Sequence, residues 1–220
     1  MKIDNRLFSL EERVFEILEE EIISGKLPRG ASLGEIALSE RLGVSRTPVR
    51  SALARLAEEG LIESRANKGA VVIGITKDDL VDIYRIRMRL EGLASLIAAE
   101  KISEEGLASL LESVELSEFY IKKKDTEKLK ELDSEFHETI YNATGNIPLC
   151  KTLSQLHRKI KTYRKLSLTV PGRLEKSIAE HREIYEAIAS GNGELADRLT
   201  SLHIERALEN MIAAFGDAQD

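Results

Sequence analysis

The chain has 220 residues, 42% of them apolar and only 5% aromatic, which suits one large domain or two smaller ones with a mainly aliphatic core. Its 32% charged residues and four prolines favour a largely helical protein. The single cysteine excludes an intramolecular disulfide and a cysteine-rich zinc site. The sequence shows neither a signal peptide nor an apolar run of membrane-spanning length, so we expect a cytoplasmic protein without membrane contact.

The net charge of −6 looks unfavourable for nucleic-acid binding until it is divided along the chain. Residues 1–75 have 11 basic and 12 acidic groups, whereas residues 76–220 have 21 and 26. Within residues 29–70 the basic groups are in excess, seven to five. Basicity is therefore local, as a surface that contacts phosphates requires.

Apolar spacing predicts a first helix over residues 10–24, ended by Gly25, and a second, short helix over residues 35–42. Between them the sequence GKLPRG is typical of a turn. The buried stripe expected along the first helix consists of Val14, Ile17, Leu18 and Ile22.

A turn and an arginine-bearing helix follow. Gly43 suits a left-handed turn position because it has no Cβ, and Ser45 is expected to cap the next helix by accepting a backbone N–H with its side-chain oxygen. Arg46 and Arg50 lie four residues apart, so both project from one side near the start of that helix. Residues 41–57 contain four arginines and no acid. A helix that presents arginines just after a turn is how a helix-turn-helix protein meets the major groove.

Two short strands are predicted after this helix, over residues 61–65 and 70–73, around a turn that contains Lys68. Three helices followed by a hairpin make a winged helix-turn-helix. Arg65 and Lys68 could then reach the DNA backbone or the minor groove beside the recognition helix. Isolated arginines usually form only a solvated helix face, so the prediction of DNA binding rests on the whole unit.

From residue 76 onward the pattern changes to long helices separated by turns that contain glycine or proline. Six helices are expected, over residues 76–99, 103–123, 126–143, 148–168, 173–190 and 193–215. The predicted fold class is therefore mainly α. A winged helix-turn-helix domain over residues 1–75 precedes an all-α bundle of six helices, with seven as the alternative, over residues 76–220.

Three of the four histidines share an arrangement with one carboxylate. Asp133 and His137 are spaced i, i+4, so both project from one helix face. His181 lies eleven residues before Asn192 and His203 eleven after it, so antiparallel helices that turn at Asn192 place both rings at the same height. Three inward imidazoles and a carboxylate are typical ligands of a divalent transition metal. Histidine nitrogens suit zinc, nickel or copper, and we expect zinc or nickel here. The alternative is that each histidine is a hydrogen-bonded core residue.

Two further residues need an explanation. His157 fits no part of this arrangement, and we expect it to be exposed. Arg87 falls on the apolar stripe of the first long helix, where an unpaired guanidinium would cost too much free energy. Either Glu91 or another acid neutralises it, or an anionic ligand does, since arginine pairs well with a carboxylate.

The stretch LGEIALSERLGVSRTPVRSALARLAEEGLI, with the first helix and KLPRG before it, resembles the DNA-binding domain of GntR-family bacterial transcription regulators. Some members of that family have a further DNA-contacting arginine where this chain has Ile36, which puts that contact in doubt. The resemblance implies operator contacts from the recognition helix and, in the minor groove, from the wing tip: Arg46, Thr47, Arg50, Lys68 and Gly69.

The sequences DIYRIRMRLEGLA and EHREIYEAI, together with the aspartate–histidine pair, resemble the effector-binding FCD domain of the FadR subgroup of this family. The resemblance implies that Arg87 helps to hold a small carboxylate effector. The metal ligands that it implies are Asp133, His137, His181 and His203.

The sequence therefore predicts a metal-containing, ligand-responsive transcription regulator, not an enzyme, that acts as a homodimer on a palindromic operator. Three alternatives stay open: the metal itself is the signal, the metal is purely structural, or the histidines activate water in a hydrolase. The hydrolase is disfavoured because no general base is expected beside the cluster. Glu138 and Glu180 adjoin the histidines in sequence but should point away on their helices.

Overall fold

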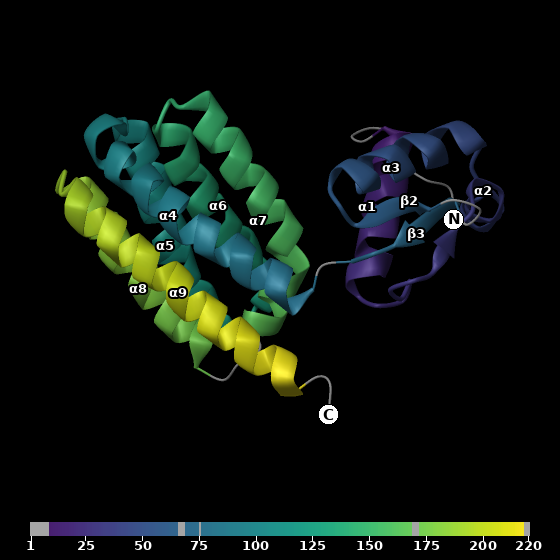
Figure 1. Cartoon of the computed structure of the whole chain (residues 1–220). Coiled ribbons are helices and arrows are strands. Elements are labelled where there is room, and N and C mark those ends of the chain that lie inside the picture. Colours follow the sequence, from purple (N-terminus) through teal and green to yellow (C-terminus); the bar gives the residue numbers. More distant parts are fainter. Residues whose placement is uncertain (1–8, 66–68, 75, 169–171, 218–220) are drawn as a thin grey trace. The chain divides into compact units, whose positions relative to one another are not determined.

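The computed structural model of the protein describes residues 9–65, 69–74, 76–168 and 172–217 (Figure 1). The chain divides into two compact units, Met1–Thr76 and Lys77–Asp220. The fold is mainly helical, as predicted. Among the described helices, none combines the length and the apolar character needed to cross a bilayer.

The described part of the first unit consists of α1 (Leu10–Ile23), β1 (Ser32–Leu33), α2 (Glu35–Leu42), α3 (Arg46–Glu58), β2 (Ile62–Arg65) and β3 (Gly69–Val72). The sheet is antiparallel with the strand order β1-β3-β2, which makes the predicted winged helix-turn-helix. The sequence does not predict β1, because two residues are too few to show a period. Ser32 and Leu33 become a strand by pairing with the other edge of β3, opposite Val71 and Ala70.

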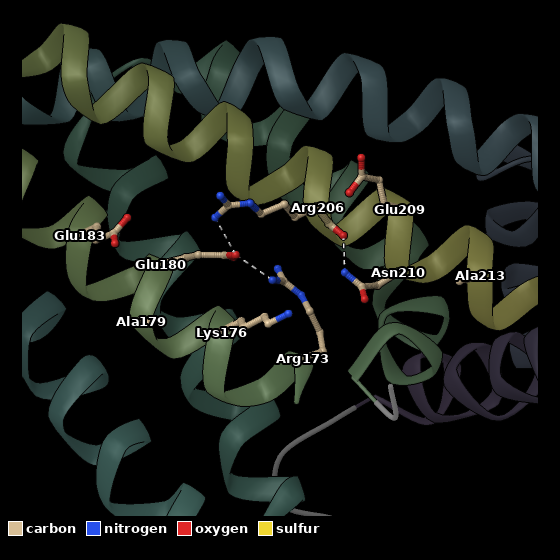
Figure 2. A pocket seen from close by; sticks show the side chains of 9 residues that line it. All are labelled: Arg173, Lys176, Ala179, Glu180, Glu183, Arg206, Glu209, Asn210 and Ala213. Atoms are coloured by element: carbon tan, nitrogen blue, oxygen red, sulfur yellow. Dashed lines mark hydrogen bonds and ion pairs between the residues drawn. The ribbon is translucent and has the colours of Figure 1, made fainter. Parts of the chain in front are cut away.

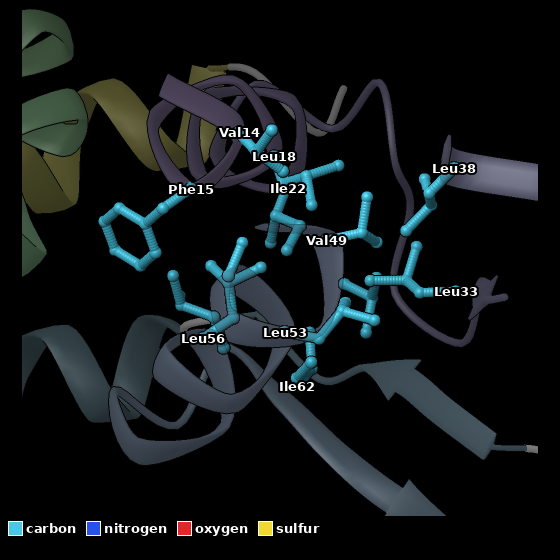
Figure 3. Close-up of a cluster of buried hydrophobic side chains, with 13 residues drawn as sticks. Val14, Phe15, Leu18, Ile22, Leu33, Leu38, Val49, Leu53, Leu56 and Ile62 are labelled. Carbon is cyan, nitrogen blue, oxygen red and sulfur yellow. The ribbon is translucent and has the colours of Figure 1, made fainter. Parts of the chain in front are cut away.

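The core of this unit lies between α1, α3 and the sheet (Figure 3). Val14, Leu18 and Ile22 are buried, as predicted, but Ile17 is 40% exposed. Each helical residue advances by about 100°, so the face centred between Val14 and Ile22 takes in Phe15 and leaves Ile17 outside. This core fixes α3 against α1 and thereby holds the arginines of α3 in place.

Gly43 and Ser45 form the turn between α2 and α3. Gly43 follows α2 with a φ of 67°, the left-handed conformation predicted for it. Ser45 occupies the N-cap position of α3, but its side chain makes no capping hydrogen bond, so that part of the prediction is wrong. A capping oxygen bonds the N–H of the second or third helical residue, and the third residue of α3 is Pro48, which has no N–H.

The described part of the second unit contains the six predicted helices: α4 (Lys77–Lys101), α5 (Glu104–Lys123), α6 (Thr126–Ala143), α7 (Ile147–Leu168), α8 (Arg173–Ala189) and α9 (Gly193–Asp217). α4 and α9 approach each other closely because Gly92 has no side chain; a Cβ there would lie 2.6 Å from Ser201 Oγ. Ser201 Oγ instead donates a hydrogen bond to the Met88 carbonyl at 3.0 Å. This contact positions the site residues that α4 and α9 contribute.

Candidate metal centre and DNA interface

Three buried imidazoles meet inside the second unit, one each from α6, α8 and α9. The ring centroids of His137 and His181 are 5.3 Å apart, those of His137 and His203 are 5.4 Å apart, and those of His181 and His203 are 4.7 Å apart. One ring nitrogen of each lies within 4.8 Å of those of the other two. The structure thus brings together the three histidines that the sequence singled out, at a spacing that one metal ion could bridge.

Asp133 lies at the edge of this histidine cluster. Its Oδ1 is 3.7 Å from His181 Nε2, and it projects from α6 one turn before His137. Asp133 does not belong to the set of three histidines whose ring nitrogens all lie within 4.8 Å of one another. The fourth predicted ligand is therefore adjacent to the cluster but farther from its centre than the imidazoles.

Carboxylates orient two of the three imidazoles. His203 Nδ1 lies 2.7 Å from Glu180 Oε2, and His137 Nδ1 lies 2.9 Å from Glu91 Oε2. In metal sites a ligand histidine typically bonds a carboxylate through its other nitrogen, which fixes the ring. His137 Nε2 is buried and makes no hydrogen bond to any described residue. The donor set and this buried nitrogen both fit a divalent metal.

The position of Glu180 corrects the expectation that it points away from the cluster. On α8 it falls on one stripe with the buried residues Ser177 and Ile184, and α9 packs against that side. Its Oε1 accepts hydrogen bonds from Arg173 Nη1 at 2.9 Å and from Arg206 Nη1 at 3.1 Å, which Figure 2 shows as dashed lines. The spacing along α8 was a signal that could have revealed its burial.

Burial and charge together set the protonation of Glu180 and His203. Burial raises the pKa of Glu180, but hydrogen bonds from His203 and Arg173 outweigh it and lower that pKa to about 2. Burial, with a smaller contribution from His137, lowers the pKa of His203 to about 4 against the opposing effect of Glu180. Neutral imidazole is the form that binds a metal, so His203 is ready to act as a ligand at neutral pH.

Arg87 and Glu91 form a buried ion pair beside the cluster. Arg87 Nε and Nη2 lie 2.7 and 2.6 Å from Glu91 Oε1, and both residues are 1% exposed. Burial opposes ionisation of Glu91, but Arg87 and then His137 outweigh it and hold the pKa of Glu91 well below its usual value. Of the two explanations for the buried arginine, the structure contains the ion pair, and Glu91 links Arg87 to His137.

His157 is 3% exposed, which corrects the expectation that it is a surface residue. It lies on one stripe of α7 with the buried residues Leu153 and Ile160, and this spacing predicts burial. Its ring centroid is 5.7 Å from that of His137, and its Nε2 is 3.4 Å from Ser134 Oγ. All four histidines therefore belong to the interior of the bundle, three of them in the cluster.

The arginines of α3 meet an acid that the sequence pattern did not single out. Arg50 Nε and Nη2 each lie 2.9 Å from a carboxylate oxygen of Glu35, the first residue of α2, and Arg46 Nη2 lies 3.1 Å from it. Hydrogen bonds from Arg50 and Arg46 lower the pKa of Glu35 to about 2. Thr47 is exposed beside them, and Ile36 is 58% exposed on the neighbouring helix. One exposed surface thus combines two arginines, a threonine and an apolar side chain.

The wing contributes the other predicted DNA contacts. Arg65 is the last residue of β2 and pairs with Gly69, the first residue of β3. Gly69 has a φ of 68°, so it takes the left-handed conformation that suits glycine. Lys68 lies outside the residues that the structure describes.

Comparison with known proteins matches both units. Residues 10–72 match the model of bacterial regulatory proteins of the gntR family, and residues 82–206 match that of the FCD domain. An uncharacterised HTH-type transcriptional regulator of Bacillus subtilis, YdhC, is 31% identical over 88% of this chain and 87% of its own length. A probable D-xylose utilization operon transcriptional repressor of Paenarthrobacter nicotinovorans is 32% identical over 89% of this chain and 86% of its own.

Among solved structures, Escherichia coli McbR/YncC matches 96% of this chain and 100% of its own with a TM-score of 0.73 and 26% identity. The relatives are transcription regulators, which confirms the prediction of a DNA-binding regulator that is not an enzyme. The chain belongs to the GntR family of bacterial regulators, with an FCD domain following its winged helix-turn-helix.

Proposed function

We propose that this DNA-binding regulator holds a divalent transition metal, zinc or nickel, in its FCD domain. His137, His181 and His203 would supply three nitrogen ligands and Asp133 an oxygen ligand. The single observation that carries the proposal is the buried cluster of three imidazoles, two of them oriented by carboxylates. Such a metal would offer a Lewis-acidic position to which a ligand's carboxylate can bind.

We also propose that a small carboxylate metabolite is the effector and that it binds beside the metal and Arg87. The Tyr84 hydroxyl is buried near this arginine and makes no hydrogen bond to a described residue. A buried hydroxyl without a partner is costly, so an acceptor brought by a ligand would be favourable there. Arg87 would contribute its positive charge while keeping its pairing with Glu91.

For the first unit we propose that Arg46, Thr47 and Arg50 read bases in the major groove. The remaining contacts would come from the wing, from Arg65, Lys68 and Gly69. The protein would act in the cytoplasm as a homodimer on a palindromic operator, because two-fold symmetry in the protein imposes the same symmetry on its site. Support comes from the exposure of both α3 arginines on one surface of the winged domain.

The experiment that tests the metal proposal is the metal content per chain, measured by elemental mass spectrometry on protein purified without chelator or affinity metal. We expect about one ion per chain in the wild type and in the control His157→Gln, which alters a buried histidine outside the cluster. The variant His181→Ala should lose the ion. No metal in the wild type, even after incubation with zinc and nickel salts, would contradict the proposal.

A second candidate is that the metal ion itself is the signal. The observation that favours it is that Glu91 already neutralises Arg87, so no organic anion is needed to stabilise that charge. Fluorescence anisotropy with operator DNA separates the two. A metal sensor changes its operator affinity with metal concentration alone, whereas an effector sensor changes it only when a carboxylate is added to the metal-loaded protein.

A further inference from the structure

A cavity of about 600 Å³ lies between α8 and α9 (Figure 2). Glu180 separates it from the histidine cluster. None of the residues proposed as metal or effector ligands lines it. The cavity is lined by charged residues and a few small or polar ones: Arg173, Lys176, Ala179, Glu180, Glu183, Arg206, Glu209, Asn210 and Ala213.

Positive charge is concentrated at the centre of this cavity. Figure 2 shows Arg173 and Arg206 at the carboxylate of Glu180 and the Lys176 ammonium beside Arg173, while Glu183 lies at one end and the side chain of Glu209 points away from the centre. Three cations therefore lie near the centre of the cavity beside a single carboxylate. The two outer acids bring the net charge of the lining to zero, so the excess of positive charge is confined to its centre.

The cationic side chains of the cavity have more N–H donors than their hydrogen bonds to Glu180 use. A guanidinium has five N–H donors and an ammonium has three. Arg173 is 3% exposed, yet within the described chain its side chain donates one N–H, to Glu180, and Arg206 likewise donates one N–H to that carboxylate. Lys176 is exposed, and its ammonium group makes no hydrogen bond or ion pair with a described residue. A buried cation with unused donors is best satisfied by an acceptor that carries negative charge.

We propose that the α8–α9 cavity binds a small dianionic oxyanion, held by Arg173, Lys176 and Arg206, and that this site is coupled through Glu180 to the metal. The chemistry is shared by a tetrahedral oxyanion and a dicarboxylate. The proposal that the cavity binds an anion depends on the cavity alone. The proposal that this binding is coupled to the metal rests on the proposed metal at the histidine cluster.

Glu180 connects the two sites because its two oxygens face opposite directions. Oε2 bonds His203 in the interior, and Oε1 bonds Arg173 and Arg206 in the cavity. With the cavity empty, two arginine charges near Glu180 oppose a metal cation at His203. An anion that neutralises them lowers this repulsion, so anion and metal strengthen each other's binding, by the same factor in both directions.

The test is isothermal titration of the full-length, metal-free protein with sodium sulfate at constant ionic strength, with sodium succinate as the dicarboxylate arm. We expect one saturable site per chain, weakened about tenfold by Lys176→Ala, which loses one charge-assisted bond. The matched control is Arg182→Gln on the same helix, whose guanidinium pairs with Glu118 outside the cavity and whose loss should leave binding unchanged. Circular dichroism verifies folding, and Lys176→Gln serves if the alanine variant is unstable.

The same titration with nickel, in the presence and absence of sulfate, tests the coupling. We expect nickel affinity to rise several-fold with sulfate in the wild type and to stay constant in Lys176→Ala. The absence of saturable binding of either anion, or equal weakening by Lys176→Ala and Arg182→Gln, overturns the anion site. Saturable anion binding by a protein that binds neither nickel nor zinc overturns the metal proposal and leaves the anion site standing. A nickel affinity that does not change with sulfate overturns the coupling.

Discussion

Replacement of Glu91 by glutamine tests the buried network beside the histidines. Glu91 and Arg87 are each 1% exposed, with Arg87 Nη2 2.6 Å from Glu91 Oε1. The neutral amide would leave the Arg87 cation buried without a countercharge, and removal of one partner of such a pair costs about 3–5 kcal/mol of unfolding free energy. Glu91 Oε2 also lies 2.9 Å from His137 Nδ1, and loss of such a carboxylate contact with a ligand histidine lowers metal affinity about 10–100-fold.

The matched control is the double variant Arg87→Met/Glu91→Gln, which removes the unpaired cation and keeps an amide beside His137. We expect it to recover most of the stability that Glu91→Gln loses, while metal affinity stays reduced in both. Hydrogen exchange of α4 and α9 amides in metal-free protein is the assay, because it reports on the helical unit alone. A cost below about 1 kcal/mol for Glu91→Gln, or a double variant no more stable than the single one, would refute the reasoning.

Three further predictions concern the rest of the chain. Arg46→Ala should weaken operator binding by about 1–3 kcal/mol and relax specificity at one base pair in anisotropy measurements; equal loss on all sequences would mark a phosphate contact instead. The Arg41 bond lowers the pKa of Glu21 from 4.5 to about 2, so this pair stabilises the fold above pH 4.5 and less as pH falls toward 2. Glu21→Gln should therefore cost about 1–2 kcal/mol at pH 6 and little at pH 2, measured by urea unfolding. Gly92→Ala should cost about 1–3 kcal/mol in thermal unfolding, because its Cβ would meet α9, whereas the control Gly34→Ala meets nothing within 4 Å.

Helix positions and the histidine cluster followed from the sequence because both depend on local spacing. The antiparallel turn at Asn192 sets His181 and His203 at one height whatever the remaining packing, and their ring centroids lie 4.7 Å apart. The expectations for Glu180 and His157 were wrong because each lies on the buried stripe of its helix, and this spacing predicts burial even for a polar side chain.

Other features depend on packing between distant segments, which one sequence does not encode locally. β1 exists only because Ser32 and Leu33 meet the other edge of β3, some forty residues later. The contact of Glu35 with Arg46 and Arg50 depends on the angle between α2 and α3, which the core beneath them sets. Periodicity identifies the buried face of an element, but it does not identify the charged group that a surface residue will meet.

The helical unit keeps polar groups in its interior that a purely structural core would replace by apolar ones. The Tyr84 hydroxyl lacks a partner among the described residues, and such a group costs about 1–3 kcal/mol. A ligand that bonds it recovers part of this cost and stabilises the folded unit by an amount that grows with the logarithm of ligand concentration above its Kd. Stabilisation is not signalling, however, because operator affinity changes only if the ligand prefers one arrangement of the protein over another. A carboxylate that protects α4 and α9 from hydrogen exchange without altering operator affinity would therefore occupy the proposed pocket without being the effector.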